Sequence, residues 1–250
     1  MTTRLDGRTA FVTGGAAGLG SVISRYLGDA GASGLVLDAA ARCPELPAGW
    51  SSLQGDVASE KDVAAAVASI DERFGGLDIV IANAGLVPPW RETANLDLDE
   101  WDRVFAVNVR GVAATIKHSV PLLRKNGGSI VVMGSLNSRR AHPQQCLYTA
   151  TKHAALGIVR AAALDLGRFG IRVNAIGPGP VATNALTERI RHRAAEGGPA
   201  VDDALAQYAG ETALGAIATA DEVARCALFL ASDASSGITG QILPIDAGLP

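Results

Sequence analysis

Short β-rich runs alternate with longer stretches of helical periodicity along this chain of 250 residues. The β-rich runs span residues 9–13, 34–38, 77–82, 128–133 and 171–176. Between them, residues 59–74 and 221–231 carry apolar side chains at the spacing of a helix. A strand, a helix and a second strand in succession form a βαβ unit, and repeated units build a parallel sheet with helices on both faces. The alternation therefore predicts an α/β fold with a doubly wound parallel sheet.

Length and composition indicate a single domain over residues 1–250. Apolar residues make up 48% of the chain and charged residues 19%, which suits a tightly packed globular protein. One segment, residues 181–215, departs from the alternation, because Glu-Gly-Gly-Pro interrupts its helical character at residues 196–199. Sites in open α/β sheets lie beyond the carboxyl ends of the strands, so we expect this segment to be a substrate lid.

Charge and hydropathy exclude several classes of protein. A formal net charge of -3 offers no basic surface for nucleic acid. No segment has the length and apolarity of a signal peptide or a membrane span, so we expect a cytoplasmic protein without membrane contact. Cys43, Cys146 and Cys226 are far apart and odd in number, and the histidines show no ligand spacing. We therefore expect free thiols and no metal site.

The first β-rich run leads into Thr-Gly-Gly-Ala-Ala-Gly-Leu-Gly at residues 13–20. Gly14, Gly18 and Gly20 stand where a strand must turn sharply into a helix. Glycine lets the backbone approach a pyrophosphate, and a helix N-terminus offers unpaired N–H groups to it. The motif predicts a dinucleotide site, with a tight turn that binds nothing as the alternative.

Asp38 ends the second β-rich run, roughly twenty residues after the glycines, where a carboxylate can accept hydrogen bonds from the adenosine ribose. The same carboxylate would repel the 2′-phosphate of NADP, and the three alanines that follow supply no cation. Asp38 therefore favours NAD over NADP as the cofactor. Arg42 is the one residue against this, although a solvated surface arginine is its simpler interpretation.

Tyr148 and Lys152 stand four residues apart, which on a helix places both side chains on one face. An ammonium group stabilises a nearby phenolate and so favours proton transfer by the tyrosine at neutral pH. Ser135 follows the run 128–133, where its hydroxyl can hydrogen-bond the substrate oxygen that Tyr148 protonates. The three residues predict an acid/base site, although Tyr and Lys at this spacing also occur on solvated helices.

In this order along nearly the whole chain, the motifs resemble those of the short-chain dehydrogenase/reductase family. The resemblance adds Asn-Ala-Gly at residues 83–85, Asn108 and Pro-Gly at residues 178–179. It implies a Rossmann-type fold of about seven strands, a nicotinamide cofactor and a homotetramer. It assigns cofactor contacts to Thr13, Gly14, Ala17, Gly18, Leu19, Gly20, Asp38, Asp56, Val57, Asn83, Ala84, Gly85, Tyr148, Lys152, Pro178, Gly179, Val181 and Thr183.

The mechanism that the resemblance implies is reversible hydride transfer between C4 of nicotinamide and a carbon that bears a hydroxyl or carbonyl oxygen. Tyr148 would be the acid/base, Ser135 would orient the substrate oxygen, and Lys152 would bind the nicotinamide ribose. Asn108 would hold a water that connects Lys152 to solvent. The chain departs from the common family pattern at Pro180 and at the tail 246–250, where relatives often carry Asp-Gly-Gly.

Substrate specificity is expected between Ser135 and Tyr148 and in the lid. The candidate substrate contacts are Ser135, Asn137, Arg139, Gln145, Arg189 and Arg191. The arginines would suit a carboxylate or sulfonate, whereas the amides would suit a sugar or polyol equally well. Arginines on a helix also form solvated faces, here with Glu188 or Glu196 as partners.

A second class of function stays open, because fold does not fix function: an NAD(H)-binding sensor or regulator without turnover. Such a protein has no physical need for a proton relay beside the nicotinamide. The set of Asn108, Ser135, Tyr148 and Lys152 therefore favours a secondary alcohol dehydrogenase or ketoreductase that acts on a polyol, sugar, hydroxy acid or hydroxy sulfonate.

Overall fold

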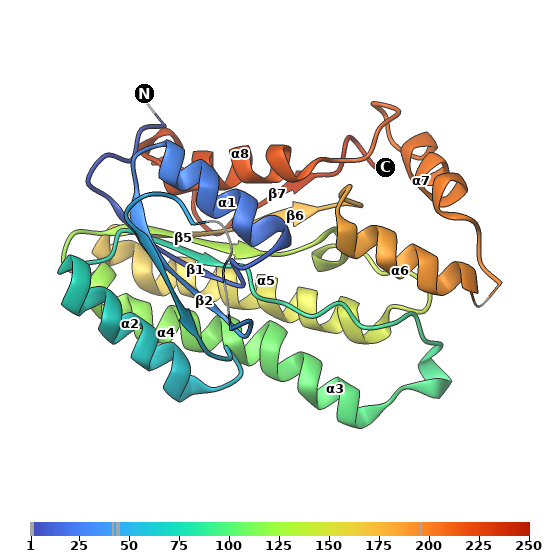
Figure 1. Ribbon diagram of the computed structural model, residues 1–250, viewed down its shortest axis with the longest axis horizontal. Helices are drawn as coiled ribbons and strands as arrows, with labels where there is room; N and C mark the ends of the chain where they lie inside the picture. The colour runs from blue at the N-terminus through green and yellow to red at the C-terminus, as the bar shows by residue number, and fades with distance from the viewer. Residues whose placement is uncertain (1–2, 42, 44–45, 196) are drawn as a thin grey trace.

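The computed structural model describes residues 3–41, 43, 46–195 and 197–250 (Figure 1). Within this part of the chain, seven parallel strands form one sheet in the order β3-β2-β1-β4-β5-β6-β7. The strands are β1 (Thr9–Thr13), β2 (Ser33–Asp38), β3 (Trp50–Gln54), β4 (Ile79–Ala82), β5 (Gly128–Met133), β6 (Ile171–Pro178) and β7 (Ile242–Ile245). Chain order reverses between β1 and β4, which confirms the predicted doubly wound fold and opens a crevice at their carboxyl ends.

Helices cover both faces of the sheet (Figure 1). On one face lie α1 (Gly18–Asp29) and α8 (Ala220–Ala231). On the other lie α2 (Glu60–Phe74), α4 (Gly111–Leu123) and α5 (Cys146–Leu166). The strands supply apolar side chains to both layers in alternation, as in β5, where Ile130 packs with the second layer and Val131 with the first. Burial on both faces explains why the strands read as continuous apolar runs.

Two strands, β3 and β7, were not among the β-rich runs found in the sequence. Both are edge strands of the sheet and only partly buried, so they lack a continuous apolar run. β7 also contains Pro244, which cannot donate to a ladder and is tolerated at an edge. β4 begins two residues later than predicted, and just before it the Asp78 carboxylate accepts from the Thr9 backbone N–H at 2.8 Å.

The segment 181–215 folds as two helices, α6 (Asn184–Ala195) and α7 (Val201–Gly210). They contact each other at one end of the molecule, beyond the sheet (Figure 1). The remaining helix, α3 (Leu98–Phe105), runs through a π-helical turn, Ala106–Arg110, into α4. No helix among the described residues is long and apolar enough to cross a membrane.

The three cysteines are free thiols. Cys226 is a buried residue of α8, and this burial raises the pKa of its thiol to about 11. Since the thiolate is the reactive form, this shift makes the Cys226 thiol less reactive.

The altered tail carries backbone strain. Ala247 has a φ of 55°, in the left-handed region, at the position where the common family pattern has glycine. An L-residue pays about 1–2 kcal/mol there, while glycine loses about 0.5–1 kcal/mol of chain entropy on folding. Ala247→Gly should therefore raise the free energy of unfolding by up to about 1 kcal/mol in urea denaturation.

The matched control is Ala68→Gly, at an exposed position inside α2. Helical backbone suits alanine, so this change should lower the free energy of unfolding by about 1 kcal/mol. Equal losses in the two variants would contradict the assignment of strain to Ala247.

Candidate active site

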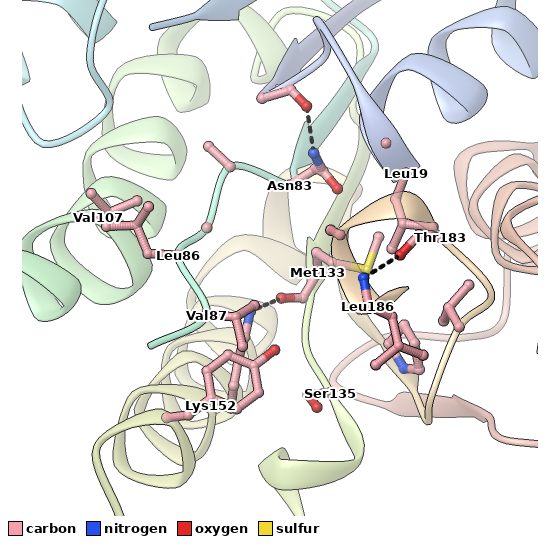
Figure 2. A pocket seen from close by; sticks show the side chains of 18 of the residues that line it. Leu19, Asn83, Leu86, Val87, Val107, Met133, Ser135, Lys152, Thr183 and Leu186 are labelled. Atoms are coloured by element: carbon pink, nitrogen blue, oxygen red, sulfur yellow. Dashed lines mark hydrogen bonds between the residues drawn. The ribbon is translucent and has the colours of Figure 1, made fainter. Parts of the chain in front are cut away.

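One cavity of about 770 Å³ lies at the carboxyl ends of the strands. Its walls come from the β1–α1 turn, from the residues that follow β2, β4, β5 and β6, and from α5, α6 and α7. Figure 2 shows side chains from α1, α5 and α6 and from the residues that follow β4, β5 and β6 around the same space. The volume lies within the range of sites for small ligands and cofactors.

The glycine-rich turn packs closely against neighbouring backbone at Gly14 and Gly20 and is open to the cavity at Gly18. A Cβ on Gly20 would stand 2.0 Å from the Gly14 carbonyl oxygen, and one on Gly14 would stand 2.7 Å from the Ala84 Cα. Gly18, with a φ of 57°, has no atom within 4 Å of such a Cβ and lines the cavity. The N-terminus of α1 has no side-chain cap and no acidic residue in its first turn. These uncapped N–H groups fit the pyrophosphate of a dinucleotide.

Asp38 is fixed at the end of β2 by the same turn. Its carboxylate accepts from the backbone N–H of Ala16 and of Ala40, both at 2.9 Å. Asp38 and Ala40 line the cavity, as do Asp56 and Val57 beyond β3. Arg42, the residue that would favour NADP, lies outside the described residues. The described contacts thus leave a carboxylate at the position expected for the ribose hydroxyls.

Thr13 and Asn83 join the ends of β1 and β4. The Thr13 hydroxyl accepts from the backbone N–H of Asn83 and of Ala84, at 3.1 and 3.2 Å. The Asn83 amide donates to the Gly14 carbonyl at 2.8 Å, as Figure 2 shows. Asn83, Ala84 and Gly85 line the cavity, whereas Thr13 and Gly20 are not among the described lining residues. Those two shape the turn from beneath.

Tyr148 and Lys152 project from α5 into the cavity, with the Lys152 Nζ 5.6 Å from the centre of the Tyr148 ring. Lys152 is buried and donates to the Met133 carbonyl at 2.7 Å, which ties α5 to the end of β5 (Figure 2). Ser135 lies two residues beyond Met133, and its hydroxyl accepts from the Asn137 backbone N–H at 3.2 Å. The Ser135 O–H therefore remains available to donate to a ligand oxygen.

Asn108 lies behind the cavity wall rather than in it. Its side chain, buried in the π-helical turn, accepts from the Leu86 N–H at 2.7 Å and donates to the Leu86 carbonyl at 2.8 Å. It also donates to the Thr151 hydroxyl at 3.3 Å. Asn108 is not among the described lining residues, but Leu86 is. The immediate role of Asn108 is therefore to hold the backbone of Leu86 in the cavity wall.

The substrate candidates separate into two groups. Ser135, Asn137, Gln145 and Arg189 line the cavity. Asn137 is already engaged, since its amide donates to Gln145 Oε1 at 2.9 Å. The other two candidates need correction: Arg139 and Arg191 are exposed and do not appear among the described residues of the cavity wall. Arg191 pairs with Glu188 on the outer face of α6, while Glu196 lies outside the described residues.

Arg189 has different surroundings from Arg191. Its guanidinium lies 4.2 Å above the ring of Trp90, inside the cavity. Burial lowers the pKa of Arg189, and the nearby phenols of Tyr148 and Tyr208 partly oppose that shift. The group still carries its charge at neutral pH, because guanidinium is a very weak acid.

Further lining residues were not assigned to the site by any motif. They include Leu86, Val87, Tyr208, Glu211 and Leu249. Tyr208 and Glu211 belong to the predicted lid, so the break in alternation was a signal for them. No sequence signal pointed to Leu249. It reaches the cavity because Arg140 donates to its carbonyl at 2.8 Å and so holds the end of the chain there.

The chain was compared with known proteins. A family model described as enoyl-(acyl carrier protein) reductase matches residues 14–250. Short-chain dehydrogenase reductase 3a of Arabidopsis thaliana is 39% identical, over 98% of this chain and 96% of that protein. The structure resembles carveol dehydrogenase from Mycobacterium avium in complex with NAD, with a TM-score of 0.90, 31% identity and 99% coverage of both chains. It also resembles levodione reductase, with a TM-score of 0.91, 28% identity and 98% coverage of both.

The contacts of Asn108 lead to a stability prediction. Asn108→Ala leaves the partly buried N–H and carbonyl of Leu86 without their side-chain partner, so the free energy of unfolding should fall by about 1–3 kcal/mol. Asn126→Ala, at an exposed residue before β5, should change it by less than about 0.5 kcal/mol. Chemical denaturation measures both variants, and an Asn108 variant as stable as the control would contradict the role given to this side chain.

Proposed function

Because this chain belongs to the short-chain dehydrogenase/reductase family, we propose that it is an NAD(H)-dependent enzyme that interconverts a secondary alcohol and its ketone. Family membership makes the chain an oxidoreductase that uses a nicotinamide cofactor. One observation carries the finer proposal: Tyr148, Lys152 and Ser135 line the same cavity as the glycine-rich turn and Asp38. A nucleotide sensor would need the turn and the carboxylate but not the proton-transfer group.

In the proposed reaction Tyr148 and Ser135 handle the proton and the substrate oxygen, and hydride transfer belongs to the cofactor. When bound, nicotinamide supplies the redox chemistry by accepting a hydride from a carbinol carbon or returning one to a carbonyl carbon. In the oxidation direction, the Tyr148 oxygen takes the proton of the substrate hydroxyl. In the reduction direction, the Tyr148 O–H gives that proton to the carbonyl oxygen. Ser135 donates a hydrogen bond to the same oxygen and so fixes its position.

Lys152 supports Tyr148 electrostatically. Its ammonium is buried, held at a fixed place by the Met133 carbonyl, and lies beside the phenol ring. A positive charge so placed stabilises the phenolate that forms each time the tyrosine gives up its proton. Lys152 has two further donors, which would bind the nicotinamide ribose. Asn108 supports this region from behind, and its proposed water link from Lys152 to solvent stays a prediction.

Asp38 is the basis for proposing NAD rather than NADP. Asp38 lines the cavity at the end of β2, and the neighbouring Ala39 and Ala40 bring no positive charge. Ribose hydroxyls can donate to this carboxylate, whereas a 2′-phosphate would be repelled by it.

Two further expectations remain predictions. The lid proposal for residues 181–215 is supported by Thr183, Leu186 and Tyr208, which line the cavity from this segment. The homotetramer rests on the family resemblance.

Removing the phenol hydroxyl tests the assignment of the acid/base. Tyr148→Phe should lower kcat by about 100-fold to 10,000-fold, because proton transfer then lacks its donor. NADH affinity, measured by fluorescence titration, should stay near that of the unmodified protein. Tyr26→Phe, on α1, is the control and should keep full turnover. Retained turnover in Tyr148→Phe would reject the proposed mechanism.

A second variant tests the cofactor preference. Asp38→Asn keeps a hydrogen-bond acceptor but removes the charge, so the ratio of kcat/KM with NAD to that with NADP should fall by roughly tenfold or more. Asp71→Asn, which removes an exposed carboxylate on α2, should leave the ratio unchanged. An unchanged ratio in Asp38→Asn would show that this carboxylate does not select the cofactor.

A further inference from the structure

Arg189 is a cation in the cavity without a carboxylate partner among the described residues. The phenol groups of Tyr148 and Tyr208 are its polar neighbours there. Its neighbour Arg191 points outward and pairs with Glu188, and Arg103, which also lines the cavity, lies 3.8 Å from Glu100. A half-buried charge that lacks a partner costs free energy, and an anion from solution would relieve that cost.

Contact with Trp90 positions the Arg189 guanidinium to bind such an anion. The Arg189 Cζ lies 4.2 Å from the centre of the Trp90 ring, within range of a cation–π contact, and its N–H donors have no hydrogen-bond acceptor in the described part of the chain. Arg193 approaches the same ring at 5.3 Å, so two positive charges gather around Trp90. A planar fork held in this way matches the two oxygens of a carboxylate.

Two other groups bear on the charge at this wall. Glu211 lines the cavity and opposes an anion, but its carboxylate accepts a hydrogen bond from Gln207 at 3.1 Å. His142 favours a polar ligand: it lines the cavity, and its buried Nε2 has no hydrogen-bond partner in the described part of the chain. A buried ring nitrogen without a partner calls for a ligand atom that can hydrogen-bond to it.

We propose that Arg189, stacked on Trp90, binds an oxyanion of the substrate, with a carboxylate as the group that fits best. The inference rests on the proposed function in one respect, since Tyr148 in the same cavity marks where the substrate reacts. The substrate is then a hydroxy acid or oxo acid, and His142 is a second polar contact to it. The cofactor's phosphates do not need Arg189, because the α1 N-terminus provides for them.

Matched ligands test the proposal without relying on turnover. Oxo acids of increasing chain length and the amide of each are titrated into the protein, with and without NADH, by isothermal titration calorimetry. The acid whose length fits should bind at least roughly tenfold tighter than its amide, which is the scale of one charge-assisted hydrogen bond. Arg189→Gln should abolish this preference and change binding of the amide by less than about twofold.

Two further variants complete the design. Arg191→Gln removes the same charge from the outer face of α6 and should keep the full preference for the acid. Arg189→Lys retains the charge without the planar fork, so it should keep part of the preference, and it serves if Arg189→Gln does not fold. Equal binding of acids and amides by the unmodified protein would overturn the proposal, as would equal weakening of both ligands in Arg189→Gln.

The same protein separates this proposal from the proposed function. Selective binding of acids without any oxidation or reduction would reject the dehydrogenase and keep the anion site. Turnover of alcohols or ketones without selectivity for a carboxylate would reject the anion site and keep the dehydrogenase.

Discussion

The site depends on the close approach of the chain segments that follow β1 and β4. Gly14 lies so near Ala84 that a side chain would collide with the backbone, and the Thr13 hydroxyl accepts from two N–H groups of the opposite loop. These contacts hold together two loops that leave the sheet at the point where chain order reverses. The crevice between them is therefore built into the sheet and needs no ligand to form. Asp38 is attached to the same turn through Ala16.

A hydrogen bond from a charged group connects helix α5, which carries Tyr148, to the end of β5 in the sheet. Lys152 reaches from α5 to the Met133 carbonyl, and two residues after Met133 the chain presents Ser135. The proposed acid/base, its supporting cation and the hydroxyl donor thus lie in a fixed arrangement on one helix and at the end of one strand. The α6–α7 segment completes the wall, and the stacking of Arg189 on Trp90 connects it to the loop after β4. In the proposed anion site, specificity would thus come from a part of the chain outside the sheet.

Sequence alone could predict the central strands and the helices between them, because local constraints define these elements. The same holds for three parts of the candidate site: the glycine-rich turn, the Tyr148 and Lys152 pair, and Ser135. Glycine is required where backbones nearly touch, and continuous apolar runs are required where both faces are buried. The edge strands β3 and β7 could not be found in this way, because partial exposure removes the pattern. The arginines could not be sorted either. Arg189 and Arg191 are two residues apart and chemically identical. Only the way α6 packs places Arg189 against Trp90 and leaves Arg191 to pair with Glu188 of the same helix.

The proposed reaction moves a hydride directly between a nicotinamide and a carbonyl carbon. That transfer can be followed by supplying NADH deuterated at the transferable position of C4 together with a mixed panel of ketones and oxo acids, and analysing the products by mass spectrometry. The expected product is an alcohol that carries deuterium on its carbinol carbon. An absence of deuterated alcohol from every member of the panel, with NADH bound and unconsumed, would contradict it.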